Sequence, residues 1–252
     1  MELSITQEDA GHTAEGLPLF IFTLCNRHGM EVRLSTLGGA IASLRAPDRH
    51  GRLADVIGGD VSDCGIHLLP APGRALHRLP WHAVPLVEDA TVGLRLVSPG
   101  PQSVVATYIL DDANGLLLHC HAAAAAQSTL SLRAAFNMAG EGDAGRQLLM
   151  IRAGRVVPAG AHEQEVKGTP WDCRLPRPVS DLPGQARYLL DPDRGENAAL
   201  HLLDLDSGRL LEIFTDAGSV RLGASDPPSQ FWLEPLMAAT DGKLMLRCGA
   251  AA

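Results

Sequence analysis

The chain has 252 residues, of which 46% are hydrophobic and 20% charged, with 21 basic against 29 acidic side chains. This is the composition of an ordinary globular protein, and the net charge of -8 argues against nucleic acid, because phosphate binding needs a concentrated basic surface. No apolar run reaches the roughly 18 residues of a membrane helix. The first ten residues lack the basic start and apolar run of a secretory signal. We therefore expect a cytoplasmic protein with no membrane or nucleic-acid partner.

Short apolar runs recur along the chain between the 26 glycines and 17 prolines, a pattern typical of an all-β sandwich or barrel. In chain order, strands are predicted at 20–24, 31–34, 93–97, 104–110, 116–121 and 210–214. Several of these runs alternate apolar with polar residues, as half-buried strands do. Turn-forming sequences at 26–29, 48–51, 111–115 and 206–208 separate strand candidates, so consecutive strands are expected to be antiparallel neighbours.

The chain shows no helical apolar stripe, low-complexity linker or composition break, so a single domain over residues 1–252 is expected. The five cysteines are odd in number, widely spaced and form no C-x-x-C pair. This spacing predicts buried reduced thiols rather than a disulfide framework or a zinc site. We expect neither a metal nor a cofactor.

Four segments in order along the chain carry a resemblance to a known family. Residues 22–56 are similar to the amino-terminal segment of aldose 1-epimerases, and residues 108–116 to the central hairpin of that family. Residues 166–174 resemble its Gly-Thr-Pro-aromatic-Asp segment, and residues 231–235, Phe-Trp-Leu-Glu-Pro, resemble the strand that carries its glutamate. The resemblance to the aldose 1-epimerase (galactose mutarotase) family implies an all-β fold, a large antiparallel β-sandwich of the galactose mutarotase-like supersandwich type, with a sugar held on a concave sheet face.

Interconverting the anomers of a sugar opens its ring, so a base must remove the proton of the anomeric hydroxyl while an acid protonates the ring oxygen. In the family a glutamate is the base and a histidine the acid, and Glu234 matches the base. Arg74 and His77 resemble the substrate-binding arginine and the first histidine, although the family's insertion around them is almost absent here. The alternative for both is a solvated loop. Trp81 is a candidate for stacking on the sugar, with a core position as its alternative.

Residues 130–137, Leu-Ser-Leu-Arg-Ala-Ala-Phe-Asn, resemble the segment that presents the acid histidine, but Arg133 occupies the position of that histidine. A guanidinium stays protonated at neutral pH, so Arg133 can donate hydrogen bonds but cannot act as the acid. Asn137 remains from the segment as a candidate for substrate binding. Asp191 is the nearest match to the family's aspartate, and a turn carboxylate before Pro192 is the alternative.

Two functions follow from these residues. The first is an aldose 1-epimerase-like isomerase with Glu234 as base and with water or another histidine, such as His119, His121 or His162, as acid. The second is a non-catalytic carbohydrate-binding or regulatory protein that has lost the acid histidine. The permanent cation at Arg133 predicts a sugar ligand that carries negative charge. The chain is expected to be a monomer or a homodimer.

Overall fold

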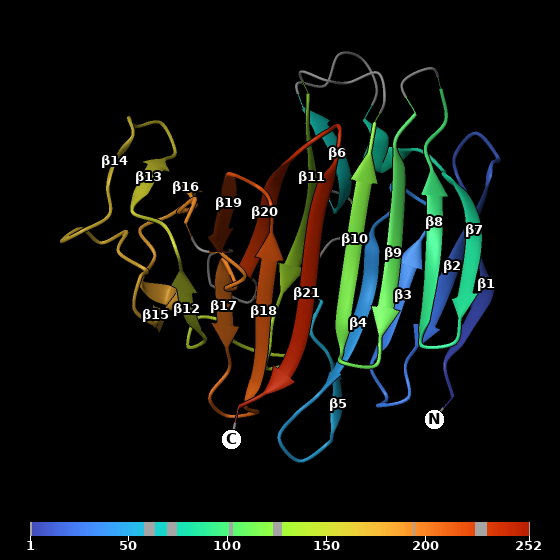
Figure 1. Ribbon diagram of the computed structural model, residues 1–252, viewed down its shortest axis with the longest axis horizontal. Coiled ribbons are helices and arrows are strands. Elements are labelled where there is room, and N and C mark those ends of the chain that lie inside the picture. The colour runs from blue at the N-terminus through green and yellow to red at the C-terminus, as the bar shows by residue number, and fades with distance from the viewer. Residues whose placement is uncertain are drawn as a thin grey trace.

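The computed structural model describes residues 2–57, 64–69, 75–100, 103–122, 128–193, 195–224 and 231–251. Within these ranges the chain consists of strands joined by turns, with two 3-10 helices, η2 (Leu76–Arg78) and η3 (Val179–Asp181), and no α-helix. The strands form three antiparallel sheets (Figure 1), which confirms the expected fold class. In the described part of the chain, no helix has the length and apolar character that crossing a membrane requires.

The three sheets differ in size and in strand order. The five-stranded sheet follows the chain through β1 (Ser4–His12), β2 (Pro18–Cys25), β3 (Glu31–Ser35), β4 (Ile41–Pro47) and β5 (Leu53–Asp55). The nine-stranded sheet has the order β15 (Arg177–Pro178), β12 (Leu148–Ile151), β17 (Leu200–Leu203), β18 (Arg209–Thr215), β21 (Gly242–Ala250), β10 (Gly115–His121), β9 (Val105–Asp111), β8 (Thr91–Val97) and β7 (His82–Glu88). The seven-stranded sheet has the order β14 (Gln164–Glu165), β13 (Arg155–Pro158), β16 (Ala186–Leu189), β19 (Ser219–Ala224), β20 (Phe231–Ala238), β11 (Thr129–Phe136) and β6 (Gly65–Leu69).

The strands and turns predicted from residue patterns are present. The turn at 26–29 joins β2 to β3 and the turn at 111–115 joins β9 to β10, each as an antiparallel hairpin. In the second turn, Asn114 has a φ of 59°, a left-handed conformation that asparagine tolerates better than most residues. Buried and half-buried residues alternate strictly along β9, so its buried side chains share one face.

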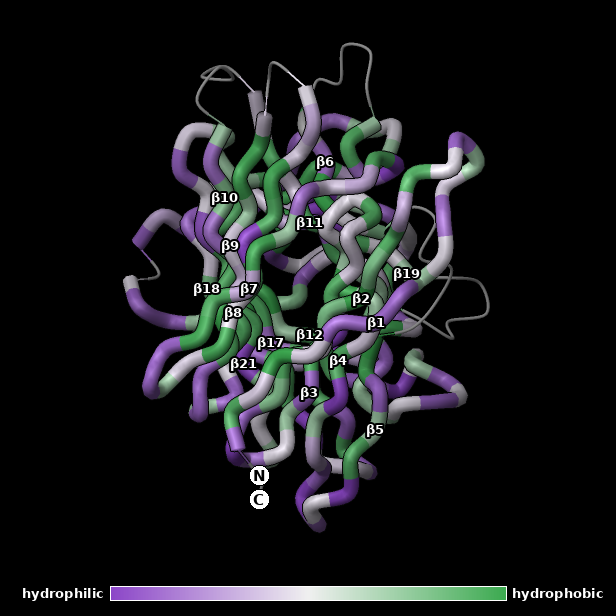
Figure 2. Tube along the Cα trace, turned by 90° about the vertical axis from the view of Figure 1, so that its right-hand side faces the viewer, coloured by the Kyte–Doolittle hydropathy of each residue, from purple (hydrophilic) through white to green (hydrophobic). Residues whose placement is uncertain are grey.

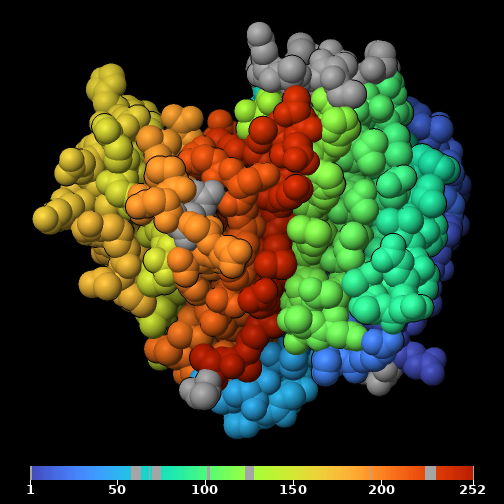
Figure 3. Space-filling model, viewed as in Figure 1, coloured from blue at the N-terminus to red at the C-terminus, as the bar shows by residue number. Residues whose placement is uncertain are grey.

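The nine-stranded sheet forms one layer, and the other two sheets form the second layer behind it (Figures 1 and 2). The five- and seven-stranded sheets meet where Ile57 bridges to Phe136 and where the N–H of Asn137 donates to the carbonyl oxygen of Val56. Buried apolar side chains from all three sheets make one core. Figure 3 views the nine-stranded layer, with the carboxyl-terminal strand β21 as a red band between green and orange strands.

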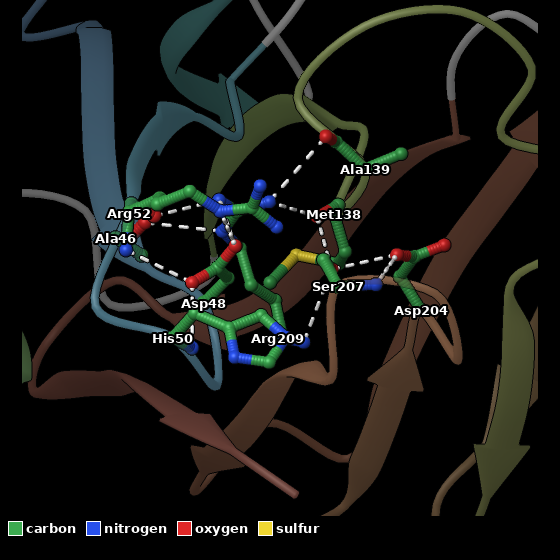
Figure 4. A network of polar contacts seen from close by, with 9 residues as sticks. All are labelled: Ala46, Asp48, His50, Arg52, Met138, Ala139, Asp204, Ser207 and Arg209. Carbon is green, nitrogen blue, oxygen red and sulfur yellow. Dashed lines mark hydrogen bonds and ion pairs between the residues drawn. The ribbon is translucent and has the colours of Figure 1, made fainter.

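A buried guanidinium connects all three sheets (Figure 4). Arg209, at the start of β18, donates to the carbonyl oxygens of Ala46 in β4 at 3.1 Å, of Met138 after β11 at 3.2 Å, and of Arg52 at 2.9 Å. Its charge faces the carboxylate of Asp48 at 4.0 Å. Burial acts to raise the pKa of Asp48, but hydrogen bonds from the Arg52 backbone and guanidinium and from a second turn N–H lower this pKa to about 2. The buried charges are therefore compensated within the fold.

Candidate functional site

Glu234 lies on the face of the seven-stranded sheet that points away from the core. Phe231 and Leu233 of β20 belong to the core. Because side chains alternate along a strand, Trp232 and Glu234 project to the opposite face, which we call the outer face.

A row of charged side chains crosses the outer face. Strand β11 pairs with β20 in one continuous register, with Ser131 across from Leu236 and Ala134 across from Leu233. Arg133 therefore lies across from Glu234. Glu234 also pairs with Arg221 of β19, and Arg221 pairs with Arg187 of β16. Directly opposite residues on one face have Cβ atoms about 5 Å apart. We call these four residues the charged row.

The carboxylate of Glu234 is buried and held by two neighbours. The side chain of Glu234 is 8% exposed, and its Oε1 accepts a hydrogen bond of 2.7 Å from the hydroxyl of Ser131. Its Oε2 lies 3.5 Å from the Arg221 guanidinium. The carboxylate is therefore fixed in position, as a general base must be.

Arg133 rests on an aromatic ring. The carbon Cζ of its guanidinium lies 4.4 Å from the centroid of the Trp232 ring, a cation–π contact. The indole in turn lies against Gly223 of β19, where an added Cβ would come within 2.8 Å of the ring carbon Cζ2. The half-exposed guanidinium thus gains stabilisation from the indole, and its burial does not by itself require an anionic ligand.

Two stacked histidines stand at the edge of the same face. His67 of β6 lies across from Ser131, and its ring stacks on that of His77 in η2 with 4.2 Å between centroids. The turn before β4 supports η2, because the N–H of Gly38 donates to the carbonyl oxygen of Leu79 at 2.9 Å. A Cβ on Gly38, whose φ is +66°, would lie 2.3 Å from the carbonyl oxygen of His77. The structure therefore places His77 next to the outer face, and His67 with it.

The structure places the other predicted site residues away from this group. Trp81 is 3% exposed and packs in the core, where its Nε1 donates to a carbonyl oxygen of η2. Asn137 is buried in the turn after β11, and its amide is bound by groups of that turn. Asp191, after β16, accepts a hydrogen bond of 2.9 Å from a backbone N–H. Arg74 lies outside the described residues.

The histidines considered as substitutes for the acid do not adjoin Glu234. His119 and His121 project from β10 of the nine-stranded layer, where their neighbours Leu118 and Cys120 face the core. His162 lies in the exposed loop between β13 and β14, and β13 is three strands from β20. Among the described histidines, His67 is the one that strand pairing sets across from Ser131, on the same face as Glu234.

Five residues of the outer face were not predicted from the sequence as site residues: His67, Ser131, Arg187, Arg221 and Trp232. The signal that could have found them is alternation, since Ser131 and Arg133 occur two apart on β11, as do Trp232 and Glu234 on β20. Alternation alone could not predict the charged row, because the row depends on which strands pair with one another.

Thiols and metal ligands offer no alternative centre in the described residues. Cys25, Cys120, Cys173 and Cys248 form no disulfide, and burial raises the pKa of Cys120 and of Cys248 to about 12, which leaves these two thiols protonated at neutral pH. No group of three or more His, Cys, Asp or Glu residues that could hold a metal ion occurs in the described ranges.

Comparisons with known proteins bear on the fold. No protein-family model and no curated protein matches the chain. Galactose 1-epimerase from Lactobacillus acidophilus NCFM is similar in structure with a TM-score of 0.75 at 16% identity, covering 100% of both chains. The GalM/aldose epimerase homologue from C. elegans also has a TM-score of 0.75 at 16% identity, covering 98% of this chain and 100% of that chain. The chain therefore has the galactose mutarotase-like fold.

Proposed function

We propose that the protein is an aldose 1-epimerase-like isomerase that binds a sugar on the outer face and interconverts its anomers. The observation that carries this proposal is Glu234, a buried carboxylate fixed by Ser131 and Arg221 on the face of the sheet that the core leaves open. Fold alone does not set function, because function resides in the site. The named activities of the structural neighbours support the same class of reaction.

In this mechanism Glu234 removes the proton of the anomeric hydroxyl. The electron pair of that O–H bond forms the carbonyl, the bond from the anomeric carbon to the ring oxygen breaks, and an acid protonates the ring oxygen. Closure of the ring on the other face of the carbonyl gives the other anomer. His67 is the acid in this proposal, because strand pairing sets it across from Ser131 on the same face as Glu234. Arg133 donates hydrogen bonds to the sugar.

Two observations favour the alternative, a carbohydrate-binding protein without catalysis. Arg133 stands where the family presents its acid histidine, and a guanidinium cannot donate a proton at neutral pH. In addition, the Glu234 carboxylate is already bound by Ser131 and Arg221. Such a protein would bind a sugar on the outer face and leave its anomer ratio unchanged.

Anomer exchange measured by NMR or polarimetry tests the proposal. Glu234→Gln keeps the shape of the side chain and removes its basicity, so exchange above the buffer rate should fall at least about 100-fold. Glu212→Gln is the matched control, because Glu212 is a half-buried glutamate of β18 whose carboxylate also lies 3.5 Å from a partner, His201. Wild-type exchange in Glu234→Gln would show that Glu234 is not the base. Sugar binding without exchange in the wild-type protein would favour the alternative.

A further inference from the structure

A pocket of about 330 Å³ adjoins the charged row on the side of β16 and β13. Arg187 and Arg221 line it, and they are its charged residues in the part of the chain that the structure describes. Small neutral residues of the loop after β13 form the opposite wall, and Trp232 forms the edge nearest to Arg133. In a protein with a net charge of -8, the described residues that line this pocket thus include two arginines and no carboxylate.

Positive charge exceeds negative charge along the row. Glu234 compensates Arg221, at 3.5 Å. Arg155, further across the same sheet, is compensated by Glu163 at 2.6 Å. By contrast, the ion pairs found among the described residues include neither Arg133 nor Arg187. Arg133 stacks on the indole of Trp232 and does not line the pocket, so Arg187 is the cation of the row most available to a ligand there.

We propose that this pocket binds the anionic group, a carboxylate or a phosphate, of an acidic sugar whose ring lies over Glu234. This inference rests on the proposed function, because it requires the anomeric carbon to sit at Glu234. Arg187 is two strand spacings from Glu234, about 10 Å, which suits a substituent at the far end of a hexose from the anomeric hydroxyl. A guanidinium presents paired N–H donors that fit both carboxylate and phosphate oxygens.

The test is calorimetric titration of the wild-type protein and of Arg187→Gln with glucose, glucuronate and glucose 6-phosphate. Arg187 is the residue to change, because Arg221 also holds Glu234. At least one acidic sugar should bind the wild-type protein about tenfold or more tightly than glucose, and Arg187→Gln should remove about tenfold of that affinity without changing the affinity for glucose. The acidic sugar that binds more tightly identifies carboxylate or phosphate. Arg95→Gln, which changes an exposed arginine of β8 in the other layer, should have no effect.

Anomer exchange of the same sugars separates this inference from the proposed function. Glucose binding as tightly as both acidic sugars, or acidic sugars binding equally to Arg187→Gln, would overturn the anion pocket even if exchange occurs. Acidic sugars that bind through Arg187 but show no exchange would support the pocket and overturn the isomerase. If none of the three sugars bound, both would be overturned.

Discussion

In the proposed mechanism, each side chain of the outer face has a role that depends on whether it can accept or donate a proton. Glu234 can accept one, and its orientation is fixed by Ser131 and Arg221. Arg133 cannot release one at neutral pH, so it can act only as a donor of hydrogen bonds and a positive charge. The imidazole of His67 has the role of acid in the proposed mechanism, because it lies across from Ser131 on the same face as Glu234.

His67→Gln tests this assignment, because glutamine keeps a hydrogen-bonding side chain and loses the titratable imidazole. Anomer exchange should fall by about 100-fold or more. His119→Gln, on the nine-stranded sheet, is the control and should behave as wild type. Exchange by His67→Gln at the wild-type rate would assign the acid to another group.

Among the elements, η2 depends on the turn between β3 and β4. Gly38 has a φ of +66°, and an added Cβ would lie 2.3 Å from the backbone of His77. Backbone atoms cannot rotate away as a flexible side chain can. The Gly-Gly pair of the first segment that resembles the aldose 1-epimerases therefore has a physical role, which is to let η2, and with it the stacked histidines, approach β6.

Gly38→Ala should lower the unfolding temperature more than Gly51→Ala does. Both positions have positive φ, at which alanine costs roughly 1–2 kcal/mol, but a Cβ on Gly51 would meet nothing within 4 Å. For a chain of this size, each kcal/mol of lost stability lowers the unfolding temperature by about 2–4 °C. The unfolding temperature of the control, Gly51→Ala, should therefore fall by a few degrees, and that of Gly38→Ala should fall clearly more. Equal losses, measured by thermal unfolding, would mean that the close approach to His77 contributes nothing.

For the whole molecule, the contacts of Arg209 and Asp48 join the two layers, since they link β18 to the turn after β4 and to the segment after β11. The carboxyl of Asp48 has a pKa of about 2, below the usual value near 3.9, because hydrogen bonds from the following turn outweigh the effect of burial. A lowered pKa in the folded state means that the ionised carboxylate stabilises the fold. This stabilisation is fully present above about pH 4 and is lost as pH falls through about 2.

Thermal unfolding between pH 6 and pH 2 should therefore show a falling midpoint for the wild-type protein and a shallower fall for Asp48→Asn, which has already lost this charge. The fall should not vanish, because the Arg174 guanidinium also holds the pKa of Asp172 at about 2. Asp206→Asn, an exposed turn residue nearby, should follow the wild-type curve. If the unfolding midpoint of Asp48→Asn fell with pH as steeply as that of the wild type, Asp48 would not contribute to the acid dependence of stability.

The sequence by itself determined the all-β class and the hairpins, because alternation and turn chemistry are local properties of a few consecutive residues. The strand that carries Glu234 was implied by the resemblance of residues 231–235 to the aldose 1-epimerases. Only the tertiary structure decided which side chains share the outer face with Glu234. Arg187, Arg221 and Arg133 lie on three strands far apart in the chain, and a register shift of one residue would turn any of these strands over. Packing likewise decided that Trp81 belongs to the core, because burial is set by the elements that cover a residue and not by its neighbours in sequence.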